Sequence, residues 1–145
     1  MAALVNSKGN SFRIVKRAKR QLAGGVKAIK GGMAVCIDGY YQPATGALGE
    51  AFLGRFTETV DNLLGADGAR FVEVEFTYER TLMLLLNDAT NPVLITDREK
   101  MVSIQDDQTV RSYTATRSDG GVFFDFDPNT GGVFVEPPVF IRPPA

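Results

Sequence analysis

The chain contains no histidine, the side chain that most often serves as a general base or a metal ligand. It also has no GxxxxGK[ST] phosphate-binding loop, no GxSxG nucleophile motif and no CxxC pair. Its single cysteine, Cys36, has no histidine to activate it and no second cysteine with which to form a disulfide. We therefore expect no catalytic residue, no cofactor and no metal, and we expect Cys36 to be a buried structural thiol.

Long apolar segments are missing as well. No run approaches the ~20 apolar residues that a transmembrane helix needs, and the first ten residues, MAALVNSKGN, lack the charged and then apolar layout of a secretory signal. We therefore expect no membrane partner, and a single cysteine fits synthesis in a reducing cytosol. Apolar residues still make up 44% of the 145 residues, which is enough for one folded domain with a core.

Residues 50–76 predict the centre of the fold. Apolar residues recur at every second position towards both ends of this stretch, which is the period of a half-buried strand. The intervening residues 61–68, DNLLGADG, are rich in residues that form turns. We expect an antiparallel β-hairpin with an ordered loop, whose first strand places Phe52, Gly54 and Phe56 on one face.

The rest of the sequence predicts further short strands. Asp38-Gly39 is typical of a two-residue hairpin turn. The short apolar run 82–86 favours a buried strand, and residues 96–100 fit one capped helical turn. Asp106-Asp107 indicates a turn, because neighbours on a strand point to opposite faces and would not converge for acid–base work. About ten strands predict an all-β fold, a small antiparallel β-barrel or sandwich of β-tulip or jelly-roll type with extended N- and C-terminal arms.

One set of polar residues resembles the ligand spacing of a calcium-binding loop. Its first, third, fifth, seventh and twelfth positions are Asp125, Asp127, Asn129, Gly131 and Glu136. Thr130, however, stands where such a loop needs glycine for its sharp turn, and both flanks alternate as strands rather than helices. We interpret the segment as a hairpin turn and expect no calcium site.

Charge and proline distinguish the two ends of the chain. Residues 1–32 contain eight basic residues and no acid, whereas the remainder has 8 basic and 17 acidic residues. We divide the chain into a basic arm at 1–22, a β-domain at 23–136 and a proline-rich tail at 137–145. The arm is an extended segment, an edge strand or a frayed terminus. Four prolines keep the tail out of a central strand, so its apolar residues seek a surface on their own core or on a neighbouring subunit.

Four sequence segments carry a resemblance to a known family. In chain order they are GGVKAIKGGMAVCIDGYYQPAT, GRFTETVDN, GADGARFVEVE and DDQTV. Their order and spacing resemble the capsid decoration (cement) proteins of tailed bacteriophages. The resemblance implies a structural virion protein that binds the outer surface of a phage head and stabilises the capsid by bridging capsomers.

The resemblance also implies partners and a location. The partners are the phage major capsid protein and further copies of the chain, as a dimer or trimer, with no small-molecule substrate. The protein would be made in the bacterial host cytoplasm and would lie on the outer capsid surface. The alternative is a non-catalytic binding module whose basic arm contacts nucleic acid or another acidic partner, although the arm lacks a surface of stacking aromatics. The predicted contact residues are Arg13, Lys16, Arg17, Lys19, Arg20, Val139, Phe140 and Ile141.

Overall fold

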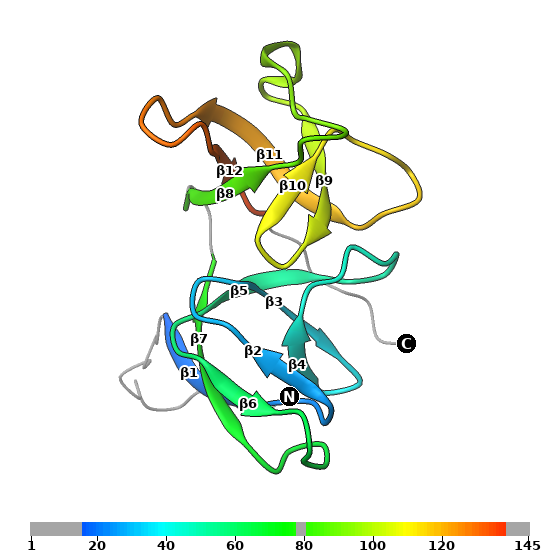
Figure 1. Ribbon diagram of the computed structural model, residues 1–145, viewed down its shortest axis with the longest axis vertical. Coiled ribbons are helices and arrows are strands. Elements are labelled where there is room, and N and C mark those ends of the chain that lie inside the picture. The colour runs from blue at the N-terminus through cyan, green and yellow to red at the C-terminus, as the bar shows by residue number, and fades with distance from the viewer. Residues whose placement is uncertain (1–15, 78–80, 139–145) are drawn as a thin grey trace, which may run out of the picture.

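The computed structural model describes residues 16–77 and 81–138, and these form an all-β protein, as the sequence predicted (Figure 1). The described strands are β1 (Arg17–Gln21), β2 (Val26–Ala28), β3 (Met33–Ile37), β4 (Tyr40–Pro43), β5 (Phe52–Phe56), β6 (Val60–Asn62), β7 (Phe71–Phe76), β8 (Met83–Asn87), β9 (Met101–Asp106), β10 (Thr109–Arg111), β11 (Asp119–Phe126) and β12 (Val133–Glu136). A short 3-10 turn, η1 (Ile95–Asp97), begins one residue before the segment 96–100, where one helical turn was expected, and overlaps its start.

The first half of the chain forms a five-stranded antiparallel sheet in the order β1-β7-β5-β3-β4, which we call the lower sheet. A parallel bridge between Leu22 and Tyr41 brings the end of β1 back to β4, so the sheet curls around its own core. A two-stranded ribbon of β2 and β6 packs against the same core. This core includes Leu22, Phe56, Val72 and Val74, all fully buried.

The second half forms a closed barrel in the order β10-β8-β12-β11-β9. All of its strand pairs are antiparallel except β10 with β8, which is parallel. Inward-facing residues such as Leu85, Ile104, Phe123 and Val135 fill it. Small barrels of this kind are packed cores rather than channels.

The core of the barrel extends onto the lower sheet, which also has a separate core of its own. Met33 and Val35 of β3 pack with the barrel residues, whereas Ala34 between them packs in the lower core, so both faces of β3 are buried. On β5, Phe52 packs with the barrel and Phe56 with the lower core. The prediction that residues 52, 54 and 56 share one face was therefore wrong for Phe52. All three are buried, but a register shift in the β3–β5 pairing redirects Phe52.

A loop between β4 and β5 fixes the barrel to the lower sheet through charged side chains. The buried carboxylate of Glu50 accepts hydrogen bonds from the backbone N–H groups of Thr45 and Gly46, at 3.0 and 2.8 Å. The Arg117 guanidinium reaches into the loop from the barrel and donates to the carbonyl oxygens of Thr45 and Ile104, at 2.9 and 2.8 Å. Buried polar groups matched in this way hold a loop in one conformation.

Several local predictions are confirmed. β5 and β7 pair antiparallel, with Arg55 opposite Glu75. Asp38 and Gly39 join β3 to β4 with positive φ angles of 52° and 90°, as a two-residue hairpin turn requires. The segment 127–132 joins β11 to β12 as a hairpin turn.

Two predictions need correction, and one of the alternatives for the basic arm can be chosen for its described part. Residues 17–21 of the arm form edge strand β1, and Leu22 is buried. Cys36 is half-buried against the lower core instead of fully buried, because β3 approaches its end there. Only alternate residues of the run 82–86 are buried, because β8 lies on the barrel wall and faces outward with every second side chain.

Candidate interaction surfaces

The described part of the chain has no cluster of three or more histidine, cysteine or acidic residues placed to hold a metal ion. Among these residues, no helix is long and apolar enough to cross a membrane. The features that stand out are instead surfaces: a paired basic strand, two apolar loops and an apolar strand face.

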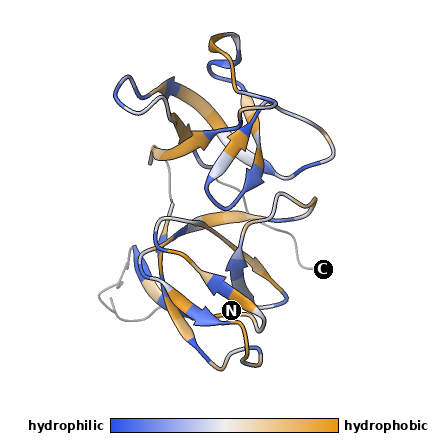
Figure 2. Ribbon diagram, viewed as in Figure 1, coloured by the Kyte–Doolittle hydropathy of each residue, from blue (hydrophilic) through white to orange (hydrophobic). Residues whose placement is uncertain are grey.

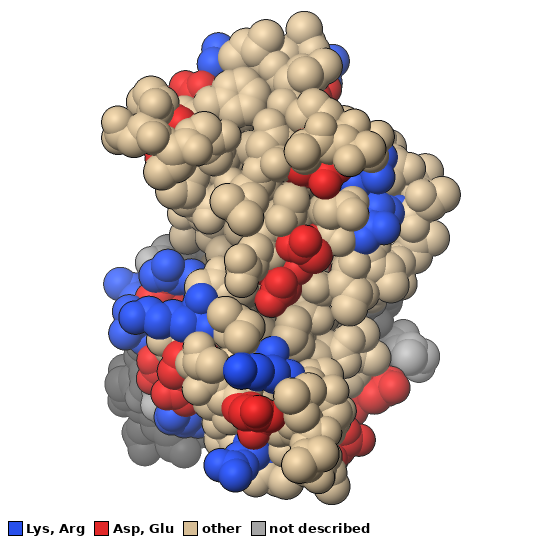
Figure 3. Space-filling model, viewed as in Figure 1, with Lys and Arg blue, Asp and Glu red and all other residues tan. Residues whose placement is uncertain are grey.

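Two basic side chains of β1, Arg17 and Lys19, form ion pairs with acidic residues. Glu75 on β7 lies between two arginines, with its carboxylate 2.8 Å from Nη2 of Arg17 and 2.9 Å from Nη2 of Arg55. Lys19 pairs with Glu58, Nζ to Oε1, at 2.6 Å. Figure 3 shows the resulting mixture of basic and acidic side chains over this part of the lower sheet. Hydrogen bonds from Arg17 and Arg55 lower the pKa of Glu75, and the one from Lys19 lowers the pKa of Glu58.

The predicted contact residues therefore do not act as one free basic patch. Arg20 points to the other side of β1 and lies over the ring of Phe76, with 5.5 Å from its guanidinium carbon to the ring centroid. Lys16 is exposed at the start of the described chain. The other predicted contact residues, Arg13, Val139, Phe140 and Ile141, lie outside the described residues.

The first apolar loop joins β6 to β7 and includes Leu63 and Leu64; we call it the Leu64 loop (residues 63–70). The Leu64 side chain is completely exposed, and Leu63 is about half exposed. One buried side chain, that of Asn62, fixes the loop by donating to the carbonyl oxygens of Ala23 and Ala66, at 2.9 and 3.1 Å. The loop thus presents leucines to solvent from a rigid support, an arrangement that sequence reasoning interpreted only as a turn.

The second apolar loop joins β8 to η1 and carries Leu94 and Ile95, both more than half exposed; we call it the Leu94 loop (residues 88–98). A single asparagine fixes this loop as well. Asn87 accepts a hydrogen bond from the backbone N–H of Val93 at 2.7 Å and donates to its carbonyl oxygen at 3.1 Å, and the Val93 side chain is buried. The two loops lie at opposite ends of the long axis of the molecule (Figure 1).

The outer face of β8 is a third apolar surface. Leu82, Leu84 and Leu86 are 40%, 46% and 58% exposed, whereas Met83 and Leu85 between them are buried. Phe134 of β12 pairs with Leu84 and is only partly buried. We call these four residues the β8 stripe. Figure 2 shows that β8 is hydrophobic along most of its length, and a strand that is apolar on both faces indicates that its outer face is also covered.

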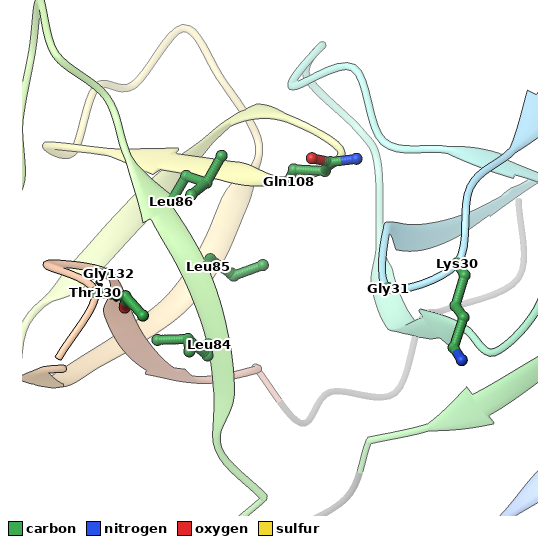
Figure 4. Close-up of a pocket in the computed structure, with 8 residues that line it drawn as sticks. All are labelled: Lys30, Gly31, Leu84, Leu85, Leu86, Gln108, Thr130 and Gly132. Carbon is green, nitrogen blue, oxygen red and sulfur yellow. Dashed lines mark hydrogen bonds between the residues drawn. The ribbon is translucent and has the colours of Figure 1, made fainter.

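A groove runs beside the β8 stripe at the junction of barrel and lower sheet. One part, of about 310 Å³, lies between β8 and the Lys30-Gly31 turn, and Leu84, Leu85 and Leu86 line it on the β8 side (Figure 4). A second part, of about 350 Å³, continues past Leu82 to the Arg55–Glu75 ion pair. The groove therefore has an apolar wall on the barrel, whereas its wall on the lower sheet combines the charged pair Arg55–Glu75 with Phe76.

The acidic residues that invited a catalytic or calcium-binding interpretation have structural roles. Asp125 forms an ion pair with Arg98 at 2.8 Å, and Asp127 accepts a hydrogen bond of 2.6 Å from the Thr130 hydroxyl within the β11–β12 turn. Asp106 ends β9 and accepts a hydrogen bond from the backbone N–H of Gln108 at 2.9 Å. As predicted, Asp106-Asp107 is part of the turn between β9 and β10.

Asp107 should cost the protein stability at neutral pH. Burial and the neighbouring Asp106 carboxylate raise the pKa of Asp107. A raised folded-state pKa means that the penalty is absent below the ordinary aspartate pKa and grows as pH rises through the folded-state value. We expect Asp107→Asn to increase the free energy of unfolding at pH 7, and the gain to vanish near pH ~3, below the ordinary aspartate pKa. Urea unfolding at both pH values tests this. Asp119→Asn, at an exposed position, is the control, and an equal gain there would contradict the prediction.

No protein-family model, curated protein or solved structure matches the chain.

Proposed function

We propose that this protein is a non-catalytic structural protein that binds the outer surface of a phage head and stabilises the capsid by bridging capsomers. The observation that carries the bridging role is the pair of rigid apolar loops at opposite ends of one elongated molecule. Leu63 and Leu64 project at one end, and Leu94 and Ile95 project at the other. Apolar side chains in exposed, fixed positions are typical of contacts with another macromolecule.

Rigidity makes these loops effective contacts. A loop that is already held by Asn62 or Asn87 loses little conformational entropy when it docks, so more of the hydrophobic free energy remains as affinity. A molecule that contacts two shell subunits also binds its second subunit at a high effective concentration. Since such a molecule binds only the assembled shell, it stabilises that shell by mass action.

The choice of a phage head as partner comes from the sequence resemblance to decoration proteins. On that basis the major capsid protein is the principal partner, the location is the outer capsid surface, and the protein acts as a dimer or trimer. The absence of a histidine and the structural roles of Asp106, Asp125 and Asp127 support a function without catalysis.

The second candidate, binding to nucleic acid through the basic arm, is less favoured. Two of the cations that would neutralise phosphates, Arg17 and Lys19, already contact carboxylates of the same chain. Phosphate would have to displace Glu75 and Glu58 from these cations. That candidate predicts an affinity that falls steeply with salt, whereas apolar loop contacts should be nearly independent of salt.

Changing one loop at a time tests the bridging role. We expect Leu63→Ser/Leu64→Ser and Leu94→Ser/Ile95→Ser each to weaken binding to undecorated heads at least about ten-fold, because each removes two apolar side chains from a contact. At saturating concentration, either variant should bind without raising the temperature at which the heads disrupt, because a single contact cannot bridge. Co-sedimentation with heads and thermal disruption of the heads give the two readouts.

The control is Leu48→Ser, which removes an exposed leucine from the loop between β4 and β5, away from both ends. It should bind and stabilise heads like the unaltered chain. If both loop variants behave like this control, the loops are not the contacts and the bridging proposal fails.

A further inference from the structure

Two hollows of different character meet at Gly31, beside the β8 stripe. The first is the part of the groove between β8 and the Lys30-Gly31 turn, and leucines of β8 line it. The second, of about 260 Å³, lies on the lower sheet, and its lining includes Lys30, Gly31, Arg17 and Arg55; we call it the cationic hollow. A Cβ atom on Gly31 would meet nothing within 4 Å, so the space beside this residue is open.

The turn between the two hollows is held in place by hydrogen bonds to its backbone. The N–H of Gly31 donates to the carbonyl oxygen of Phe56 at 2.7 Å, and the N–H of Lys30 donates to the Thr59 hydroxyl at 3.1 Å. The Lys30 side chain extends away from the leucines of β8, on the side of the lower sheet (Figure 4). A ligand that crosses the turn at Gly31 therefore passes from an apolar wall to a wall that carries positive charge.

The cationic hollow keeps donors for an incoming anion. Arg55 uses Nε and Nη2 to bind Glu75, both at 2.9 Å, which orients its guanidinium and leaves Nη1 without an acceptor among the described residues. In the same part of the chain, Lys30 Nζ has no carboxylate partner. The three cations of this hollow are matched by only two carboxylates, Glu73 and Glu75, so one positive charge remains.

An extended peptide fits the apolar side of this arrangement. The outward-facing leucines of β8 stand at every second residue, about 6.7 Å apart, and side chains on one face of an extended peptide have the same spacing. A wholly apolar peptide would leave the cations of the second hollow unmatched, whereas a wholly acidic one would leave the leucines exposed. The ends of this chain outside the described residues, 1–15 and 139–145, contain no acidic residue, so they do not supply a carboxylate.

We propose that the two hollows together bind an extended segment of another protein, in which apolar residues at alternate positions adjoin acidic residues. The apolar residues lie on the β8 stripe, and the carboxylates bind Lys30 and Arg55 beyond Gly31. The contact uses neither of the apolar loops and does not require a phage head. It can therefore hold or fail independently of the proposed function.

Synthetic peptides test the two halves of this proposal separately. The probe is a dye-labelled peptide with three leucines at alternate positions, separated by serines, and two aspartates either after or before them. We expect one order of this probe to bind the full chain at least about ten-fold more tightly than its counterpart with lysines for the aspartates, or with serines for the leucines. Fluorescence anisotropy measures the affinities, and the preference for aspartate should shrink as salt is added.

Protein variants assign the binding to these residues. Lys30→Gln/Arg55→Gln should reduce the preference for aspartate over lysine to about two-fold or less, because it removes both cations that contact the carboxylates. The matched control is Lys100→Gln/Arg70→Gln, which removes one exposed lysine and one exposed arginine that do not line either hollow; it should keep the full preference. Leu84→Ser/Leu86→Ser should weaken the aspartate probe about ten-fold or more. Circular dichroism verifies that each variant keeps the β fold.

Three results would overturn the proposal. The first is no binding of the aspartate probe, in either order, at protein concentrations up to about 1 mM. The second is an equal loss of preference in the control variant. The third is displacement of the bound peptide by an equal concentration of single-stranded oligothymidylate, which would assign the cationic hollow to nucleic acid instead.

Discussion

Replacing Phe52 by alanine should lower the free energy of unfolding by about 3–5 kcal/mol, the range found when a buried phenylalanine is truncated. Phe52 is 1% exposed and packs with Met33 and Val35 of the lower sheet and with the barrel residues. Its removal leaves a cavity at the junction, where the lower sheet and the barrel both supply the walls. Denaturant unfolding followed by far-UV circular dichroism measures the loss.

The comparison for this experiment is Phe124→Ala, because Phe124 is 48% exposed in the bulge of β11. The same atoms are removed at this position, but about half of the side chain is exposed to solvent. The decrease in the free energy of unfolding should therefore stay below about 1 kcal/mol. If the two variants lose the same stability, Phe52 does not join the barrel to the lower sheet as described.

Replacing Gly54 by alanine adds only one methyl group. It should nevertheless lower the free energy of unfolding by about 3 kcal/mol or more. Gly54 pairs with Phe76 at the centre of the lower sheet. A Cβ atom at this position would overlap the carbonyl oxygen of Glu75 and lie 3.0 Å from the Cα atom of Phe76. Both obstacles are backbone atoms of β7, so relief requires the two strands to separate.

Gly39→Ala separates this steric effect from the ordinary cost of losing a glycine. Gly39 has a φ of 90°, but a Cβ there would meet nothing within 4 Å. In Gly39→Ala, backbone strain should lower the free energy of unfolding by only about 1–2 kcal/mol. Thermal unfolding of the two proteins gives the comparison, and a loss for Gly54→Ala no larger than that for Gly39→Ala would show that β5 and β7 can adjust.

The basic residues show how tertiary pairing changes the meaning of a charge pattern. Counted along the chain, Arg17 and Lys19 belong to an acid-free segment, which predicts a surface for an acidic partner. In the fold, Arg17 of β1 pairs with Glu75 of the neighbouring strand β7, and Lys19 pairs with Glu58 in the segment between β5 and β6. These partners lie 58 and 39 residues away in the sequence, so no local pattern reports the pairing.

The sequence alone determined the all-β class, the β5–β7 pairing and the Asp38-Gly39 turn. Each depends on the period of two and on residues that tolerate positive φ, which are local properties of the chain. Only the tertiary structure decided which surface each apolar residue faces. It placed Phe52 and Phe56 in different cores and left Leu82, Leu84 and Leu86 on the outside of the barrel. The physical reason is that alternation separates the two faces of a strand, but the neighbours that cover each face are supplied by distant segments.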